Sequence, residues 1–485
     1  MERLTLDRTV LFLGFGAVAQ CVLPLFFEKF APSPGVKIYI MDIQDYRHRI
    51  PESLRQQVEY IQKKITSDNI EKTLATYLNA GDMLIDLAYD IDCCTVLQWC
   101  HDYQVMYLNT SVELWNPYLT HDKSPEIRTL YPRHMAIREM LKTWDKKGAT
   151  AVLEHGANPG LVSHFTKKAL IDIAKKIILE QPENSKIDTL KQYIATKNFP
   201  LLAQTLGVKV IHISERDTQL TQAPKQVGEF VNTWSVAGLY EEGTAPAEMG
   251  WGTHEEELPP HSFTHQEGPK NQICLGKMGM ETWARSYVPS GDIVGMIVRH
   301  GEAFTISDHL TVWENGHAVY RPTVHYVYCP SDSAISSLHE LKMNHLEFPK
   351  KMRILNDEII QGKDEVGVLL MGHDFKSWWT GSVLDIEQAR QLVPHQNATT
   401  LQVASSIVAA MCWMHKNPEQ GVCVPDDLPY QEILEVATPY LGEIISQPFD
   451  WTPLKNRVNF FADFSGEQLN EQDPWQFKNF HLPIF

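Results

Sequence analysis

A glycine-rich hexapeptide near the start of the chain has the residue types and spacing of a dinucleotide-binding turn. Gly14, Gly16 and Ala19 form the pattern G-x-G-x-x-A directly after a short apolar run. The first glycine permits a tight turn, the second lets the backbone approach a pyrophosphate, and the small third residue lets helix and strand pack closely. Phosphate would then lie on the helix N-terminus, against Ala17 and Val18.

An acidic residue follows where such a turn needs one. The apolar run 36–41 ends at Asp42, 23 residues after Ala19. A carboxylate there would accept hydrogen bonds from the ribose hydroxyls and repel a 2′-phosphate. The pattern therefore favours NAD over NADP. The alternative is a tight turn in an α/β protein that binds no nucleotide.

A second motif, His155-Gly-Ala-Asn-Pro-Gly160, lies between a predicted strand and a predicted helix. Asn158 suits a helix N-cap and Pro159 suits the first helical position. The carboxyl end of a strand in an open α/β sheet is also where the ligand crevice lies. We therefore expect Asn158 either to cap the helix or to contact the nicotinamide or the substrate.

Acidic residues concentrate in one stretch of a chain whose formal charge is −17. Residues 226–269 contain eight Glu and no Lys or Arg, and Glu215 and Trp234 lie on strand-like flanks close by. A carboxylate beside an aromatic face suits a ligand with ammonium groups, through ion pairing and a cation–π contact. We expect a cationic ligand there. The structural alternatives are a solvated charged face, a Glu215–Arg216 ion pair and a core tryptophan.

Other chemistry-bearing residues give weaker signals. His261 and His265 have the spacing H-x-x-x-H, but they lie in a proline-rich stretch where the rings need not converge, so no metal site is predicted. His300 follows the strand-like run 292–299 and would face a cleft if that strand ends at one; the alternative is a core or surface histidine. The eight cysteines form no Cys-x-x-Cys pair, which favours reduced thiols in a cytoplasmic protein over a disulfide framework or a zinc site.

The composition excludes several classes of protein. With 485 residues, of which 43% are hydrophobic, the chain can bury a large core and form several domains. A net negative charge without a Lys/Arg cluster argues against nucleic-acid binding. Gly14, Gly16 and Pro24 interrupt the apolar run 10–27, and no positively charged region precedes it. A buried strand, a turn and a helix are therefore expected there, and no membrane span.

These motifs need a particular order of elements to position them. Up to about residue 155, short apolar runs alternate with helical patterns, which predicts a parallel sheet with helices on both faces. The predicted strands are 9–13, 36–41, 82–88, 105–108 and 150–153, with a helix at 92–99 between two of them. The first part of the chain is thus predicted to be a Rossmann-type, doubly wound α/β domain.

From about residue 160 the pattern changes. A helix is predicted at 161–179, and period-two alternation then predicts a second, α+β domain with a largely antiparallel sheet. Its strand-like stretches are 208–215, 229–236, 292–300, 303–313 and 322–329. We expect a loop at 259–269, and we expect the apolar helix 398–414 to pack back on the first domain. The predicted boundaries are 1–157, 158–393 and 394–485.

Taken together, the motifs resemble those of bacterial homospermidine synthases, whose relatives include carboxynorspermidine and saccharopine dehydrogenases. The similar segments, from about residue 9 to 477, are GFGAVAQ, HGANPGLVS, HISERDTQ, FVNTWSVAG, PAEMGWGTHE, RPTVHYVY, GVLLMGHD, HQNATTLQV and DPWQF. The resemblance implies bound NAD, small cationic diamines (putrescine and spermidine) as substrates, and a homodimer.

The resemblance also implies a reaction. A hydride passes from the amine-bearing carbon of putrescine (or spermidine) to NAD, a second putrescine attacks the imine, ammonia leaves, and the hydride returns. The alternative is an NAD(P)-dependent dehydrogenase of the carboxynorspermidine or saccharopine type. That enzyme would need Arg216, Arg299 or Arg321 for a substrate carboxylate. A third possibility is an NAD-binding protein without turnover.

Residue roles follow from the same resemblance. Glu215 is expected to bind an amine and transfer protons, and Trp234 to face the cationic intermediate. Glu113 and Glu242 are expected to orient the diamine, with Glu241 as the alternative to Glu242. Asn158 and His300 are the further catalytic or pocket positions, and Asn158 and Trp234 also bind substrate. The cofactor-binding set is Gly14, Gly16, Ala17, Val18, Ala19, Asp42, Leu87, Ala88, Thr110, Ala157 and Asn158.

Overall fold

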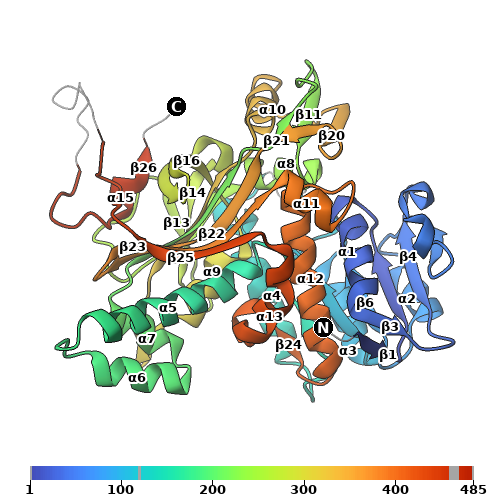
Figure 1. Ribbon diagram of the computed structural model, residues 1–485, viewed down its shortest axis with the longest axis horizontal. Helices are drawn as coiled ribbons and strands as arrows, with labels where there is room; N and C mark the ends of the chain where they lie inside the picture. Colours follow the sequence, from blue (N-terminus) through green and yellow to red (C-terminus); the bar gives the residue numbers. More distant parts are fainter. Residues whose placement is uncertain (1–2, 118–121, 458–468, 483–485) are drawn as a thin grey trace.

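The computed structural model describes residues 3–117, 122–457 and 469–482. Its two main sheets are a parallel sheet in the N-terminal part of the chain and a larger mixed sheet in the rest (Figure 1). One hydrophobic core runs from a face of the first sheet, past helix α12 (Ala398–Lys416), to a face of the second. The predicted fold class, a Rossmann-type sheet followed by a mostly antiparallel one, is confirmed.

The parallel sheet forms as predicted from the alternating apolar runs. In spatial order its strands are β24 (Val422–Cys423), β8 (Ala151–Val152), β7 (Met106–Asn109), β6 (Met83–Asp86), β2 (Val10–Leu13), β4 (Ile38–Asp42) and β5 (Glu59–Gln62). Every pair of neighbours is parallel. The order reverses between β4 and β6 around β2, so a crevice is expected at the carboxyl end of β2.

Helices bury both faces of this sheet, which explains why its strands are apolar runs. Val10 and Phe12 of β2 belong to the core that includes α1 and α12, whereas Leu11 and Leu13 belong to a separate core with α2 and α3. The helices of this part are α1 (Ala17–Lys29), α2 (Ile70–Tyr77), α3 (Cys93–Tyr103) and α4 (Tyr131–Leu141). The apolar run at 10–27 is thus a buried strand, a glycine turn and a helix.

The C-terminal segment contributes to both main sheets. Strand β24 extends the parallel sheet beside β8, and α12 lies against α1 (Figure 1). Two later strands, β25 (Glu443–Phe449) and β26 (His481–Leu482), pair instead in the mixed sheet. The described part of residues 394–485 is therefore divided between the two halves of the molecule.

The mixed sheet is built around the parallel pair β9 and β19. Along its main path the strands are β13 (Ser262–Thr264), β14 (Gln272–Met278), β12 (Pro246–Gly250), β19 (Thr323–Cys329), β9 (Val210–Asp217), β22 (Lys363–His373), β23 (Lys376–Asp385) and β25, with β16 (Gly291–Val298), β15 (Trp283–Val288) and β26 branching from β19. The remaining pairs in this sheet are antiparallel. The predicted loop at 259–269 was wrong at its centre, because β13 pairs there with β14.

Helices and short sheets surround the mixed sheet. The helices are α5 (Leu161–Glu180), α6 (Ile187–Thr196), α7 (Phe199–Leu206), α8 (Val236–Thr244), α9 (Gly301–His309), α10 (Asp332–Met343), α11 (Ile386–Leu392), α13 (Tyr430–Ala437) and α15 (Phe477–Phe480). The short pairs are β1 (Leu4–Leu6) with β3 (Phe30–Pro32), β10 (Leu220–Thr221) with β21 (Ile359–Gln361), β11 (Glu229–Asn232) with β20 (Lys351–Ile354), and β17 (Val312–Glu314) with β18 (His317–Tyr320).

Two strand predictions in this half were confirmed only in part. The stretch 303–313 is mostly helix α9, followed by the short strand β17. Phe304 and Ile306 fit a strand, but Ala303, Ile306 and Leu310 also recur at helical spacing and are buried. The stretch 229–236 gives only β11, outside the mixed sheet, because the Ser235 hydroxyl accepts the Gly238 N–H at 3.0 Å and starts α8.

Candidate active site

The predicted cofactor residues all lie at the carboxyl ends of parallel strands. The set comprises Gly14 to Ala19 after β2, Asp42 at the end of β4, Leu87 and Ala88 after β6, Thr110 after β7, and Ala157 and Asn158 after β8. Five adjacent strands thus present these residues along one edge of the sheet. This edge is where open α/β sheets bind ligands.

The two positions of the turn are glycines for different structural reasons. Gly14 has φ = +86°, and a Cβ there would lie 2.8 Å from the backbone nitrogen of Ala88, so the backbone excludes a side chain. Gly16 has a common backbone conformation, and a Cβ there would meet nothing within 4 Å. It caps α1 without a side-chain hydrogen bond, which leaves backbone N–H groups for an anion. The turn therefore fits a dinucleotide pyrophosphate.

Asp42 is tied to the same turn. Its Oδ2 accepts the Phe15 N–H at 2.6 Å and its Oδ1 accepts the Gln44 N–H at 2.8 Å. A carboxylate oxygen has a second lone pair, so both oxygens can still accept a ribose hydroxyl. The bonds fix the carboxylate beside the glycine turn, where the sequence motif requires it.

Asn158 does not cap the helix that follows it. The N-cap of α5 is Gly160, so the capping alternative was wrong. The Asn158 side chain instead donates from Nδ2 to Glu215 Oε2 at 3.0 Å. This bond joins the end of β8 in the first sheet to strand β9 in the second.

Glu215 is a buried carboxylate at the centre of this junction. Only 3% of the residue is exposed, and its Oε2 also accepts the Tyr326 hydroxyl at 2.7 Å. Burial raises its pKa to about 8, against which the hydrogen bonds from Tyr326 and Asn158 act. Arg216 points elsewhere, to Asp332 at 3.2 Å, so the Glu215–Arg216 pair was wrong. Glu215 can therefore exchange a proton near neutral pH.

His300 lies beside Glu215 and between two carboxylates. Its Nε2 is 3.0 Å from Glu242 Oε1, and its Nδ1 is 3.2 Å from Glu302 Oε2. Burial alone would lower the pKa of His300, but the charges of Glu302 and Glu242 outweigh it and raise that pKa well above its usual value. The two carboxylates therefore stabilise the protonated form of His300, and the centroid of its ring lies 4.4 Å from that of Tyr326.

Trp234 reaches the same cluster through two tyrosines. Its Nε1 donates to the Tyr328 hydroxyl at 3.0 Å, and Tyr328 stacks on Tyr326 at 5.1 Å. Trp234 is half-buried, unlike the fully buried core tryptophan Trp379. Its position beside buried carboxylates suits a cation–π contact.

Glu241 and Glu113 belong to a neighbouring cluster held by arginines. Glu241 Oε1 lies 3.0 Å from Arg133 and also pairs with Arg299. Burial alone would raise the pKa of Glu241, but the two arginines lower it. Glu113 accepts the Ser111 hydroxyl at 2.7 Å, and burial together with the charge of Glu241 raises its pKa to about 7. Of the adjacent pair, Glu242 thus faces His300 and Glu241 faces the arginines.

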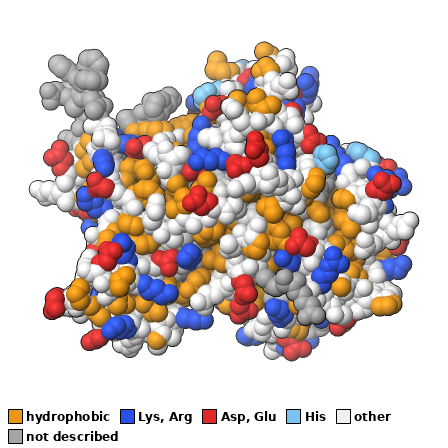
Figure 2. All heavy atoms as spheres, in the orientation of Figure 1, with side chains coloured by type: hydrophobic (Ala, Val, Ile, Leu, Met, Phe, Trp, Pro, Cys, Tyr) orange, Lys and Arg blue, Asp and Glu red, His pale blue; other side chains and the backbone are white. Residues whose placement is uncertain are grey.

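Four of the other acids in the stretch 226–269 have hydrogen-bond or ion-pair partners outside these two clusters. Glu229 pairs with Lys351 and Arg353, Glu248 accepts the N–H groups of Leu130 and Tyr131, Glu255 accepts hydrogen bonds from Thr323 and Phe477, and Glu257 pairs with Lys478. On the face shown in Figure 2, acidic and basic side chains are interspersed. Most of this acidic run is therefore structural or solvated, and only Glu242 lies against His300.

Sequence reasoning missed several residues of the site. Tyr326 and Tyr328 face Glu215 because alternation along β19 puts them on one face, a signal that the stretch 322–329 contains. Asp217, two residues after Glu215, is buried opposite Asp364 of β22. Burial and then the charges of Glu215 and Asp217 raise the pKa of Asp364 well above its usual value. No local sequence pattern predicts that Asp364 lies near the site.

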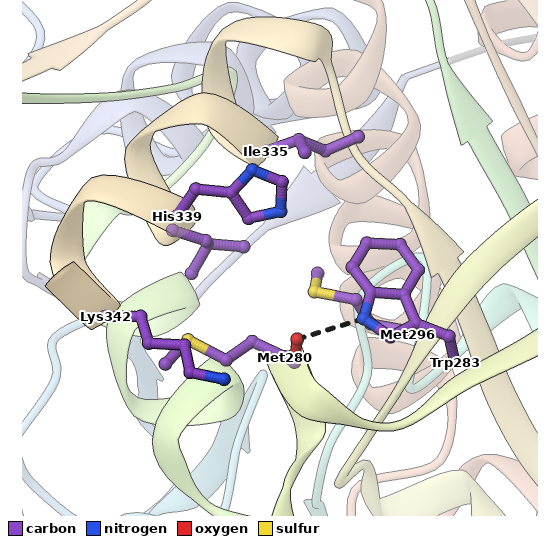
Figure 3. Close-up of a pocket in the computed structure, with 7 residues that line it drawn as sticks. Met280, Trp283, Met296, Ile335, His339 and Lys342 are labelled. Atoms are coloured by element: carbon purple, nitrogen blue, oxygen red, sulfur yellow. Dashed lines mark hydrogen bonds between the residues drawn. The ribbon is translucent and has the colours of Figure 1, made fainter. Parts of the chain in front are cut away.

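A separate hollow lies between α10 and the β15–β16 hairpin (Figure 3). Its lining is mostly apolar: Met280, Trp283, Met296, Ile335, Leu338, His339 and Lys342. It has room for about 10 Å³, roughly one water molecule. None of the predicted site residues lines it, and it is too small for a diamine.

Three further properties bear on the chemistry. Among the described residues, no three His, Cys, Asp or Glu side chains are grouped so as to hold a metal ion. All eight cysteines are free thiols. None of the described helices is both long and apolar enough to cross a membrane.

Comparison with known proteins gives the family. The chain matches the saccharopine dehydrogenase NADP binding domain over residues 10–152 and the saccharopine dehydrogenase C-terminal domain over residues 156–448. It is 38% identical over 484 residues to homospermidine synthase of Blastochloris viridis (98% of this chain, 97% of that protein). It is also 38% identical over 481 residues to that of Mesorhizobium japonicum (97% and 95%).

A solved structure agrees with these relatives. The crystal structure of homospermidine synthase from Legionella pneumophila in complex with NAD is similar at a TM-score of 0.86 and 37% identity. The match covers 100% of this chain and 99% of that one. The chain belongs to the homospermidine synthase family.

Proposed function

We propose that this protein is a homospermidine synthase that transfers an aminobutyl group from one putrescine (or spermidine) to another putrescine and releases ammonia. The observation that carries the proposal is the convergence of Glu215, His300, Glu242 and Trp234 beside Asn158 at the carboxyl edge of the parallel sheet. Buried carboxylates and an aromatic face suit a ligand whose charges are ammonium groups.

The cofactor in this proposal is NAD, held by the turn from Gly14 to Ala19 and by Asp42. The open space at Gly16 and the uncapped start of α1 fit its pyrophosphate. Bound there, NAD would supply hydride acceptance from the amine-bearing carbon, giving an imine, and hydride return to the Schiff base of the second diamine. Leu87, Ala88, Thr110 and Ala157 line the same edge.

Glu215 is the proton-transfer residue of the proposal. Asn158 and Tyr326 both donate to its Oε2, which fixes the carboxyl group and leaves Oε1 as the oxygen that faces a ligand amine. A pKa of about 8 lets it take a proton from an attacking ammonium group and give one to departing ammonia. Glu242, already paired with the His300 imidazolium, binds the other amine, and Trp234 faces the cationic carbon and nitrogen.

The dehydrogenase alternative needs a cation for a substrate carboxylate. Each arginine that would serve is already engaged: Arg216 by Pro330 and Asp332, Arg299 by Arg128 and Glu241, and Arg321 by Thr311. A carboxylate substrate that displaced Glu241 from Arg299 would leave the buried Glu241 charge without this partner. The geometry therefore favours a substrate that carries positive charge alone.

One assay separates the possibilities. The protein is incubated with putrescine and a catalytic amount of NAD, without added NADH, and the products are followed by mass spectrometry. Homospermidine and ammonia in excess of the NAD supplied support the transferase. A requirement for stoichiometric NAD(P)H and a keto or aldehyde acid would overturn it, and so would the absence of turnover.

We propose domain boundaries after residues 157 and 393, the first of them next to the junction between the two matched domains. We also propose a cytoplasmic homodimer. Light scattering on the purified protein tests the dimer, and a monomer at assay concentration would contradict it. Cell fractionation tests the compartment.

A further inference from the structure

The buried carboxylate of Glu154 joins the two halves of the site. Glu154 directly precedes the His155 motif, is 1% exposed and has φ = 57°, in the left-handed region. Its N–H donates to Asn109 Oδ1 at 2.8 Å, and its Oε2 lies 3.0 Å from Nε2 of the buried His134 on α4. A non-glycine residue in this conformation is costly and persists only where its surroundings over-determine it.

The Glu154 carboxylate lies against the first turn of α9. A Cβ at Gly301 would overlap this carboxylate, so a larger residue between His300 and Glu302 would have to displace it. Glu302 is fully buried, and burial and the charge of Glu154 both raise its pKa, against the lowering effect of His300. Four residues after Glu154, Asn158 donates to Glu215. One residue thus contacts the helix start that carries His300 and begins the loop that carries Asn158.

We propose that Glu154 is a positioning residue: it fixes the side chains of His300 and Asn158 relative to each other around Glu215, across the boundary between the two sheets. This inference rests on the function proposed above. The groups that face His300 are Glu242, Glu302, Glu215 and the ring of Tyr326. Those that face Glu154 are His134, Glu302 and the Cys93 thiol.

The test compares Glu154→Gln with Glu248→Gln. Glu248 is also fully buried and also crosses the boundary, but its hydrogen bonds go to the Leu130 and Tyr131 N–H groups at the start of α4. Glu154→Gln keeps the shape and removes the charge. We expect a fall in kcat of about 10-fold to 100-fold, as a misplaced catalytic group gives. Calorimetry should also show weaker putrescine binding. Both properties should stay near wild type in Glu248→Gln.

The pH profile separates positioning from a merely structural role. Without the charge of Glu154, Glu302 ionises more readily, so the acid limb of kcat/KM should move to lower pH in Glu154→Gln alone. Equal behaviour of the two variants in kcat, putrescine affinity and pH limb would overturn the inference. If Glu154→Gln does not fold, His134→Asn removes the outer partner of the same pair. Wild-type kcat and pH profile in that variant would also overturn it.

Failure of this inference is distinguishable from failure of the proposed function. A wild-type protein that forms no homospermidine would refute the function, and the calorimetric comparison of putrescine binding would then decide the role of Glu154. A wild-type protein that turns over while Glu154→Gln matches Glu248→Gln would refute the inference alone.

Discussion

Glu241 and Glu242 are neighbours on α8, yet their carboxylates have different kinds of partner. Glu241 is clamped by Arg133 and Arg299, whose charges are permanent, whereas Glu242 pairs with His300. Arginine side chains keep their charge at ordinary pH, whereas an imidazole paired with carboxyl groups can gain or lose a proton. In the proposed function, the arginine cluster contributes stability, and proton transfer belongs to the cluster of Glu215, His300 and Glu242.

The largest effect should come from Glu215→Gln, which removes the proton-transfer group and keeps its shape. We expect kcat for homospermidine formation to fall about 10³-fold, within the range for loss of general acid–base catalysis. Calorimetric NAD affinity should be unchanged, since Glu215 lies outside the glycine turn. Loss of NAD binding together with activity would show that Glu215 is structural.

The same variant should be more stable than wild type at high pH. The folded-state pKa of Glu215, about 8, lies above its ordinary value of 4.5, so the folded protein holds a proton that the unfolded chain has released. Wild type therefore loses this contribution as pH rises from about 4.5 to 8. We expect Glu215→Gln to melt a few degrees higher at pH 9 and close to wild type at pH 5. A higher melting temperature of wild type at pH 9 would contradict this.

Glu241→Gln should affect stability first. It leaves Arg133 and Arg299 buried without their shared carboxylate, and breaking a buried pair costs about 3–5 kcal/mol. Chemical denaturation at neutral pH measures this loss. Glu242→Gln is the matched control, expected to cost less stability and to lower kcat about 10-fold to 100-fold. A larger loss of stability in Glu242→Gln than in Glu241→Gln, together with a larger loss of kcat in Glu241→Gln, would contradict the comparison.

The smallest effect should distinguish a ring from no ring at Trp234. A cation–π contact contributes about 0.5–2 kcal/mol. Trp234→Phe should therefore retain several-fold more kcat/KM for putrescine than Trp234→Ala, although both lose the hydrogen bond to Tyr328. Steady-state kinetics on the two variants measures this, and equal losses would exclude a cation–π role.

A site residue can be predicted from the sequence when the residues that it interacts with are close to it along the chain or lie on a neighbouring predicted strand. The dinucleotide turn was predictable because Gly14, Gly16 and Ala19 act within one strand–turn–helix unit, and Asp42 ends the neighbouring strand. The choice between Glu241 and Glu242 was not, because Arg133 lies more than a hundred residues away and Arg299 was not predicted to pair. Sequence alone left both carboxylates as candidates.

Errors in the second half have a similar cause. The stretch 303–313 fits both a strand and a helix, and the burial of α9 against β12 and β19 decides for the helix. Asn158 had the residue type of an N-cap, but a tertiary hydrogen bond to Glu215 uses its side chain. Glu154 has a recognisable local context, because it lies between a strand and a glycine motif. Its contact with α9 is tertiary, so this context does not predict it.

The most direct test of the central claim follows the hydride. Putrescine deuterated at both amine-bearing carbons is incubated with the protein, catalytic NAD and an excess of unlabelled NADH in solution, and homospermidine is analysed by mass spectrometry. If the bound cofactor takes and returns the same hydride, as the proposed function requires, the product keeps all of its deuterium. A product that lacks one deuterium would show that reduced cofactor exchanges with solution during turnover and would contradict recycling at one site.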